Sequence, residues 1–259
     1  MFPALDLPSP APGARWRLTT WAAPVRFCAL ARTVVPWLWA ACIALALVGL
    51  WLGFAVAPTD AVQREAYRII YIHVPAAWMS MLLYLAMAGW AAVGWAWRVR
   101  MAAILAEAIA PTGAMFTAVA LVTGALWGRP TWGTYWVWDA RLTSELILLF
   151  LYLGVITLRA AIDDRRRADA ATALLAIVGA LNVPIIYFSV RWWSTLHQGA
   201  SVSITAAPTM ARTMLAAMLV MTLAFWAFAF AAVFTRARGL ALAREAVHDW
   251  ARAHQEHRA

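Results

Sequence analysis

Two histidines carry the metal-binding chemistry that this sequence offers. His73 stands two residues before Pro75, and proline suits the first turn of a helix. The partial positive charge of a helix N-terminus disfavours protonated imidazole, and neutral imidazole is the form that binds metals. His197 follows the pair Trp192 and Trp193 in a later segment. We therefore take His73 and His197 as candidate metal ligands, although a lone histidine near a membrane is more often structural.

The segment 127–141 lies between these histidines and is the densest aromatic stretch of the chain. It holds four tryptophans and one tyrosine in fifteen residues. Gly128, Pro130 and Gly133 argue against a continuous helix, because proline and glycine interrupt helices. We predict a loop whose rings form a platform, although tryptophans near a membrane surface usually only anchor depth. The platform residues are Trp127, Trp132, Tyr135, Trp136 and Trp138.

This combination of residues matches the chemistry of haem. Haem offers a flat apolar ring, an iron that takes axial imidazoles and two anionic propionates. Aromatic rings pack against such a ring, and arginines pair with propionates through charge-assisted hydrogen bonds. Arg141, Arg68 and Arg129 are candidate propionate partners, and in an alternative arrangement Asp139 pairs with Arg141 to fix the loop. A carrier must release its cargo, which favours an open shelf over a closed pocket.

The composition indicates a membrane protein. Of the 259 residues 64% are hydrophobic and 13% are charged, against about 25% charged in an ordinary soluble domain. The net charge of +9 does not indicate nucleic-acid binding, because the basic residues, all of them arginine, are spread in short runs between apolar segments. Cys28 and Cys42 form neither a C-x-x-C pair nor a C-x-x-C-H motif, so zinc, thioredoxin-like chemistry and covalent c-type haem have no support.

Six apolar segments are long enough to cross a bilayer, which needs about 20 residues. The fold class we predict is all-α, a polytopic bundle of six transmembrane helices. The membrane domain covers 36–235, the tails cover 1–35 and 236–259, and the first apolar segment stays as a helix instead of being a cleaved signal peptide. The predicted spans are Trp37–Ala57, Ile72–Trp97, Met101–Trp127, Leu142–Leu158, Ala170–Val190 and Thr213–Thr235.

The arginines predict the orientation of these spans. With alternating spans, fifteen of the 21 arginines fall on one side and six on the other. The arginine-rich side is cytoplasmic by the positive-inside rule, so both termini are cytoplasmic and the functional loops are periplasmic. Inside the spans, Glu107 is expected to reach the interface or to pair with Arg98 or Arg100, and Glu145 to have a structural role near a helix N-terminus.

The segment Trp132–Asp139 resembles the tryptophan-rich WWD signature of haem-handling membrane proteins. Together with Tyr67–Ala77 and Asn182–Gly199, the longer run Trp127–Tyr152 is similar to the haem-delivery family of system I cytochrome c maturation, the CcmC or haem exporter C family. The resemblance covers about residues 36 to 235, and Tyr135 departs from it where a tryptophan is expected. It implies that His73 and His197 are axial ligands of a non-covalent b-type haem.

The resemblance also implies partners and a location. Proteins of this family present haem to the periplasmic chaperone CcmE and work in a complex with the ABC ATPase CcmA, the membrane subunit CcmB and the small single-span subunit CcmD. They lie in the bacterial inner membrane and are not themselves enzymes. This chain has no G-x-x-x-x-G-K-[ST] phosphate loop, so ATP hydrolysis is expected in a separate subunit.

Three other functions compete with haem presentation. An electron-transfer cytochrome b usually places its ligands deep in facing helices, whereas both candidate ligands here fall on one side. A haem permease would need a transport path, and the sequence has no paired inverted repeats that mark one. A scaffold in which the aromatic loop only docks partners would purify without haem.

Overall fold

The computed structural model describes residues 23–193, 195–197, 202 and 208–245, and these residues form helices joined by short connections. Six helical stretches are long and apolar enough to cross a membrane, which confirms the predicted fold class. The helices are α1 (Pro24–Trp51), α2 (Ile70–Trp97), α3 (Arg100–Trp132), α4 (Ala140–Ala161), α5 (Arg165–Gly179), α6 (Asn182–Trp192) and α7 (Arg212–Arg244), with a π-helical turn at Leu52–Val56 and a 3-10 turn at Glu65–Ile69.

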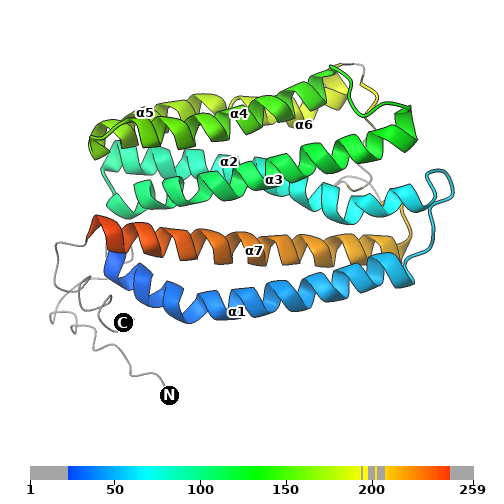
Figure 1. Cartoon of the computed structure of the whole chain (residues 1–259), viewed down its shortest axis with the longest axis horizontal. Coiled ribbons are helices and arrows are strands. Elements are labelled where there is room, and N and C mark those ends of the chain that lie inside the picture. Colours follow the sequence, from blue (N-terminus) through cyan, green and yellow to red (C-terminus); the bar gives the residue numbers. More distant parts are fainter. Residues whose placement is uncertain (1–22, 194, 198–201, 203–207, 246–259) are drawn as a thin grey trace.

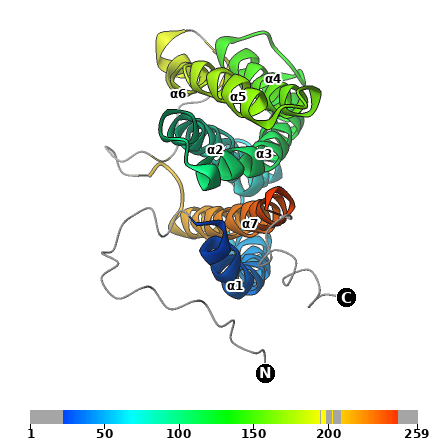
Figure 2. The ribbon, with the colours of Figure 1, turned by 90° about the vertical axis from the view of Figure 1, so that its left-hand side faces the viewer.

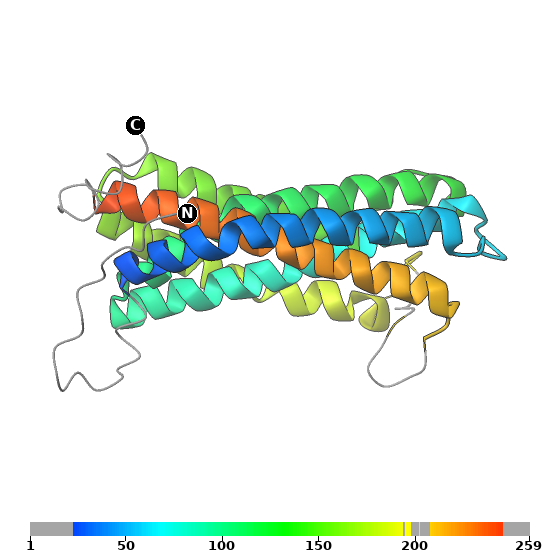
Figure 3. The same ribbon diagram turned by 90° about the horizontal axis from the view of Figure 1, so that it is seen from below.

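The helices lie roughly parallel in three layers (Figure 1). α1 packs along α7 on one side, α2 packs along α3 in the middle, and α4, α5 and α6 cover the other side. The end-on view separates the same layers (Figure 2). Seen from below, α1 lies along the whole length of the bundle (Figure 3). The start of α1 and the end of α7 lie at one end of the bundle, and the connections 57–64 and 133–139 and the end of α6 lie at the opposite end.

The first and last helices extend beyond the predicted span boundaries. α1 begins at Pro24, so Arg26 and Arg32 belong to the helix, and α7 continues to Arg244. Each of these stretches has 33 residues, more than the roughly 20 that cross the hydrocarbon. Their arginine-bearing turns can therefore project beyond the apolar layer. The remaining parts of the predicted tails, 1–22 and 246–259, lie outside the described residues, together with His248, His254 and His257.

The prediction of a loop beginning near residue 127 was wrong for its first part. α3 continues through Gly128 and Pro130 and ends at Trp132, and the residue that caps it, Gly133, has the positive φ of 80° that glycine adopts readily. Pro130 lies in the last turn, where it removes only one backbone hydrogen bond, and the hydroxyl of Thr131 donates to the carbonyl of Trp127 at 2.7 Å. Trp127 and Trp132 therefore lie on a helix, and only residues 133–139 form the connection.

The fifth span is divided into α5 and α6 just before Pro184. The Asn182 side chain donates from Nδ2 to the carbonyl of Ser144 at 2.8 Å and so joins the start of α6 to α4. Deeper in the bundle, the Tyr152 hydroxyl of α4 donates to the carbonyl of Ser80 in α2 at 2.8 Å. These two bonds between buried groups fix α4 against both α2 and α6. α2 carries His73, and α6 precedes the connection that holds His197.

Glu107 makes different ion pairs from those predicted. Its carboxylate pairs with Arg159 at 3.5 Å and with Arg244, instead of with Arg98 or Arg100. Arg100 pairs with Glu245 at 2.7 Å. The prediction considered only the nearby turn, whereas packing of α3 against α4 and α7 brings more distant arginines to Glu107.

Candidate functional site

His73 lies in the first turn of α2 with only 8% of its surface exposed. Its Nδ1 is 3.1 Å from the hydroxyl of Thr123 in α3. That hydroxyl already donates its hydrogen to the carbonyl of Val119 at 2.6 Å, so it can only accept from the imidazole. His73 Nδ1 is therefore the protonated nitrogen, and Nε2 keeps the lone pair that a metal requires.

Gly124 allows α3 to approach this imidazole closely. A Cβ at this residue would lie 3.0 Å from Cε1 of His73 and 3.5 Å from its Nδ1. The first distance is tighter than ordinary van der Waals contact, so a larger residue would displace the ring. Gly124 and Thr123 together fix where the His73 ring lies and which nitrogen is free.

His197 reaches the same site from the connection that follows α6. Its ring centroid is 6.3 Å from that of His73, and the two ring planes differ by 29°. The Trp132 ring is 5.9 Å from His197, and the His197 backbone N–H donates to the Thr195 hydroxyl at 3.1 Å. Two histidines that are 124 residues apart in the sequence thus lie side by side.

Three of the five predicted platform rings line the cavity between these histidines. Trp127 meets His73 edge-on at 5.5 Å and donates from Nε1 to Gln63 at 2.6 Å. Trp132 and Trp136 also line the cavity, and the buried Nε1 of Trp136 has no hydrogen-bond partner among the described residues.

The other two aromatic residues lie outside the cavity lining. Trp138 is 77% exposed and packs edge-on against Trp136 at 5.3 Å. Tyr135 is 55% exposed, and the Arg129 guanidinium lies 5.8 Å from the centre of its ring. Both rings are therefore on the surface beside the cavity.

Only one of the three candidate arginines lines the cavity. Arg141 does so, while one of its nitrogens donates to the carbonyl of Ile186 at 3.2 Å. Arg129 donates to the carbonyl of Gly133 and is exposed. Arg68 bonds Glu65 at 2.5 Å and the carbonyls of Gly53 and Ala57, so it fixes the end of the first span.

Asp139 caps α4 and is not among the ion pairs of the described residues. Its Oδ1 accepts from the backbone N–H of Leu142 at 2.8 Å, as expected of an N-cap residue. Its Oδ2 is buried without a hydrogen-bond partner among the described residues. No ion pair joins Asp139 to Arg141 in the described part of the chain, although their opposite charges attract each other, and Arg141 lines the cavity.

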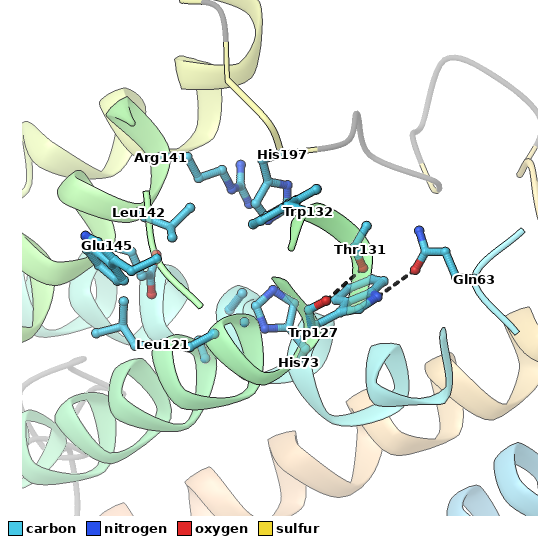
Figure 4. A pocket seen from close by; sticks show the side chains of 15 residues that line it. Gln63, His73, Leu121, Trp127, Thr131, Trp132, Arg141, Leu142, Glu145 and His197 are labelled. Atoms are coloured by element: carbon cyan, nitrogen blue, oxygen red, sulfur yellow. Dashed lines mark hydrogen bonds between the residues drawn. The ribbon is translucent and has the colours of Figure 1, made fainter. Parts of the chain in front are cut away.

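Figure 4 shows the cavity with Arg141, His197 and Trp132 close together and His73 and Trp127 across from them. Its volume is about 60 Å³, far below the roughly 300–1,000 Å³ of a pocket that encloses a small ligand. A large flat ligand could therefore enter only in part, with its remaining edge outside.

Sequence reasoning missed three residues of the site. Gln63 orients Trp127, Thr123 orients His73, and Glu145 lines the cavity with one carboxylate oxygen accepting from Ser80 at 2.7 Å. Glu145 lies four residues after Arg141 on α4, so helical spacing could have placed it on the same face. Gln63 and Thr123 had no comparable signal, because their partners come from distant segments.

The described side chains around the cavity offer two imidazoles instead of a zinc-type ligand set. No group of three or more histidine, cysteine or acidic residues that could hold a metal ion occurs in the described part of the chain. Two imidazoles beside three tryptophans that line one cavity, at one end of a six-helix apolar bundle, define a polytopic membrane protein with an aromatic, histidine-containing site.

Comparison with known proteins identifies the family. The family model described as "Heme exporter protein C", CcmC, matches residues 17–252, and the chain belongs to this family. It is 53% identical over 180 residues to "Heme exporter protein C" of Escherichia coli, covering 70% of this chain and 74% of that protein. The protein of the same name from Bradyrhizobium diazoefficiens is 50% identical over 202 residues, covering 78% and 76%. A "Putative cytochrome c biosynthesis ccmC-like mitochondrial protein" of Marchantia polymorpha is 48% identical over 162 residues, covering 62% and 68%.

Proposed function

We propose that this chain binds haem b as a transient cargo through His73 and His197 and presents it to a periplasmic haem chaperone. The observation that carries the proposal is the separation of the two imidazoles. A metal–imidazole bond of about 2.0 Å, plus about 1.1 Å from the bonded nitrogen to the ring centre, puts the ring centres of two imidazoles on opposite sides of one metal about 6.2 Å apart. The ring centroids of His73 and His197 are 6.3 Å apart.

The remaining side chains of the cavity fit the same cargo. The rings of Trp127, Trp132 and Trp136 suit the face of a porphyrin, and Arg141 suits a propionate. The unpaired Nε1 of Trp136 is a second donor available to a propionate oxygen. These groups fit haem, whereas Arg68 and Arg129 are engaged elsewhere.

Presentation to a partner is supported by the small volume of the cavity. Because about 60 Å³ cannot enclose a porphyrin, one edge of the bound ring would stay accessible. Trp138 and Tyr135 are exposed beside this edge and suit a protein partner, since aromatic residues are enriched at interfaces. We assign this docking role to the chaperone CcmE.

The names of the relatives support a role in haem export and cytochrome c maturation within an ABC-type complex. We place CcmA, CcmB and CcmD as the partner subunits, with ATP hydrolysis in CcmA and haem handling without catalysis in this chain. The arginine distribution favours an inner-membrane orientation with both termini cytoplasmic and the histidine site periplasmic. No feature of the described residues favours an electron-transfer cytochrome or a permease over this function.

Absorption spectra of purified protein test the ligand assignment. We would purify the full chain and the variants His73→Ala and His197→Ala in detergent, with His254→Ala as a matched control outside the described residues. We expect low-spin haem in the wild type and the control. Each ligand variant should lose haem or become high-spin and recover a low-spin spectrum when imidazole is added. Unchanged spectra in both ligand variants would refute the ligand assignment, and a wild type without haem would favour the docking scaffold.

A further inference from the structure

A second cavity lies at the opposite end of the bundle from the histidine site. It has a volume of about 350 Å³ and is bounded by α2, α3, α4, α5 and α7. This volume falls within the range of pockets that hold small ligands. Most of its lining is apolar and includes Met87, Ala91, Ala106, Ala110, Val155 and Leu240.

Four charged residues form an ion-pair network at this cavity, and three of them, Glu107, Arg159 and Asp169, line it. Arg159 pairs with Glu107 at 3.5 Å and with Asp169 at 3.1 Å. Arg244 pairs with the same two carboxylates, at 3.1 Å from Asp169. Two cations and two anions therefore neutralise one another, and this network holds α3, α4, α5 and α7 together around the cavity.

Arg236 is the charged residue of the cavity lining that does not belong to this ion-pair network. It lines the cavity from α7 and is exposed. Among the described residues it takes part in no hydrogen bond or ion pair, whereas Arg159 and Arg244 each meet two carboxylates. The cavity thus combines an apolar interior with one uncompensated positive charge at its exposed edge.

We propose that this cavity binds an anionic phospholipid, with an acyl chain in the apolar interior and the phosphate on Arg236. Basic pockets between transmembrane helices on the cytoplasmic side bind anionic lipid headgroups, and this end is cytoplasmic in the orientation proposed above. Arg159 lies two residues before the end of α4, whereas Ala110 lies ten residues into α3, so the cavity extends from the charged end of the bundle towards its interior.

A second haem is a poorer occupant than a lipid. The lining contains neither histidine nor cysteine, so it offers no imidazole or thiolate to an iron. An acyl chain needs only apolar contacts, which Ala106, Val155 and Leu240 provide. A lipid seated here would contact the helices that the charged network joins, and it would stabilise their packing by binding the folded state.

Native mass spectrometry of the full chain in detergent tests this site. The probe is an equimolar mixture of phosphatidylglycerol and phosphatidylcholine, and the readout is the ratio of the two bound lipids. We expect the wild type to prefer phosphatidylglycerol. Arg236→Gln should lower this ratio by about fivefold, which corresponds to about 1 kcal/mol for one basic residue near the lipid surface. Ala106→Leu should lower the occupancy of both lipids by filling the cavity.

Two matched controls separate a specific site from general effects. Arg166→Gln removes an exposed arginine at the same end outside the cavity, and Ala86→Leu adds the same bulk to an exposed face of α2. Both controls should keep the wild-type ratio and occupancy. The proposal is overturned if the wild type shows no preference, or if Arg166→Gln changes the ratio as much as Arg236→Gln. Cooperative thermal unfolding of Ala106→Leu is the control which shows that its loss of lipid comes from the filled cavity and not from misfolding.

Discussion

The hydroxyl of Thr123 accepts a hydrogen bond from Nδ1 of His73 at 3.1 Å while donating its own hydrogen to the carbonyl of Val119. This pair of bonds determines the tautomer of a nearly buried imidazole. A residue in α3 therefore prepares a ligand in α2 for metal binding. Partners of this kind typically change metal affinity by about 10–100-fold when they are removed.

Replacing Thr123 with valine should weaken haem binding without removing the ligand. Valine is similar in size but cannot accept from Nδ1, so the His73 ring would lose its fixed tautomer. We expect haem affinity to fall by about 10–100-fold, measured by titration of haem into the purified apoprotein. Thr123→Ser keeps the hydroxyl and should bind as the wild type does. Equal loss in both variants would attribute the effect to packing instead of the hydrogen bond.

The three candidate arginines should respond differently to substitution. Arg141 lines the cavity, so Arg141→Gln removes the proposed propionate partner. A hydrogen bond to a charged group is worth about 1.5–3 kcal/mol, so we expect haem affinity to fall roughly tenfold or more in the same titration. Arg129→Gln should leave affinity unchanged, because Arg129 bonds Gly133 outside the cavity. A larger loss in Arg129→Gln than in Arg141→Gln would reverse the assignment.

Arg68→Gln should reduce stability more than haem affinity. Arg68 bonds the carbonyls of Gly53 and Ala57 and the carboxylate of Glu65, so it ties the end of the first span to the start of the second. We expect a lower thermal unfolding midpoint with an unchanged haem spectrum. Thermal unfolding followed by circular dichroism, alongside the spectrum of the folded sample, distinguishes this role from propionate binding.

The sequence was sufficient to predict the six spans and the meeting of the two histidines. Apolar segments of transmembrane length and their alternation put His73 and His197 at one end of the bundle, because four spans, an even number, lie between the start of the second span and the connection after the fifth. The aromatic segment was also predicted correctly as a neighbour of both histidines, since Trp127 contacts His73 and Trp132 contacts His197.

The course of the chain through 127–132 could not be predicted from residue types alone. Glycine and proline penalise a helix in general, but near a helix end the cost of Pro130 is one hydrogen bond, and Gly128 brings Cα close to the Trp132 ring and the Thr134 carbonyl. The choice among Arg68, Arg129 and Arg141 likewise depended on tertiary contacts. Each arginine lies within three residues of an aromatic residue in the sequence, and only packing separates their roles.

Gly124→Ala should disturb the His73 ring from within α3. The added methyl group would lie 3.0 Å from Cε1 of His73, so the imidazole must shift or α3 must move. Such overpacking costs about 1–3 kcal/mol, and we expect a lower unfolding midpoint together with a changed haem spectrum. Gly89→Ala is the matched control on α2, where an added Cβ meets nothing within 4 Å, and alanine should be neutral or stabilising there. An unchanged spectrum in Gly124→Ala would mean that His73 tolerates displacement.

Trp138→Ala should separate haem binding from haem presentation. Trp138 is 77% exposed and does not line the cavity, whereas Trp136, its edge-on neighbour, does. Removing the exposed ring takes away contact area for a partner, and truncating an aromatic residue at an interface commonly costs more than about 1 kcal/mol of binding. We therefore expect Trp138→Ala to keep the wild-type haem content and spectrum.

The second half of this test measures transfer to the chaperone. Haem-loaded Trp138→Ala, mixed with purified CcmE, should show weaker association and slower transfer than the wild type, whereas Trp136→Ala should already lose haem in the purified protein. Exposed Trp37 on α1 supplies a control, because Trp37→Ala removes a ring of equal size that is 75% exposed and does not line the cavity. If Trp138→Ala lost haem as Trp136→Ala does, the ring would belong to the binding platform. If it transferred haem at the wild-type rate, the chaperone would have to dock elsewhere.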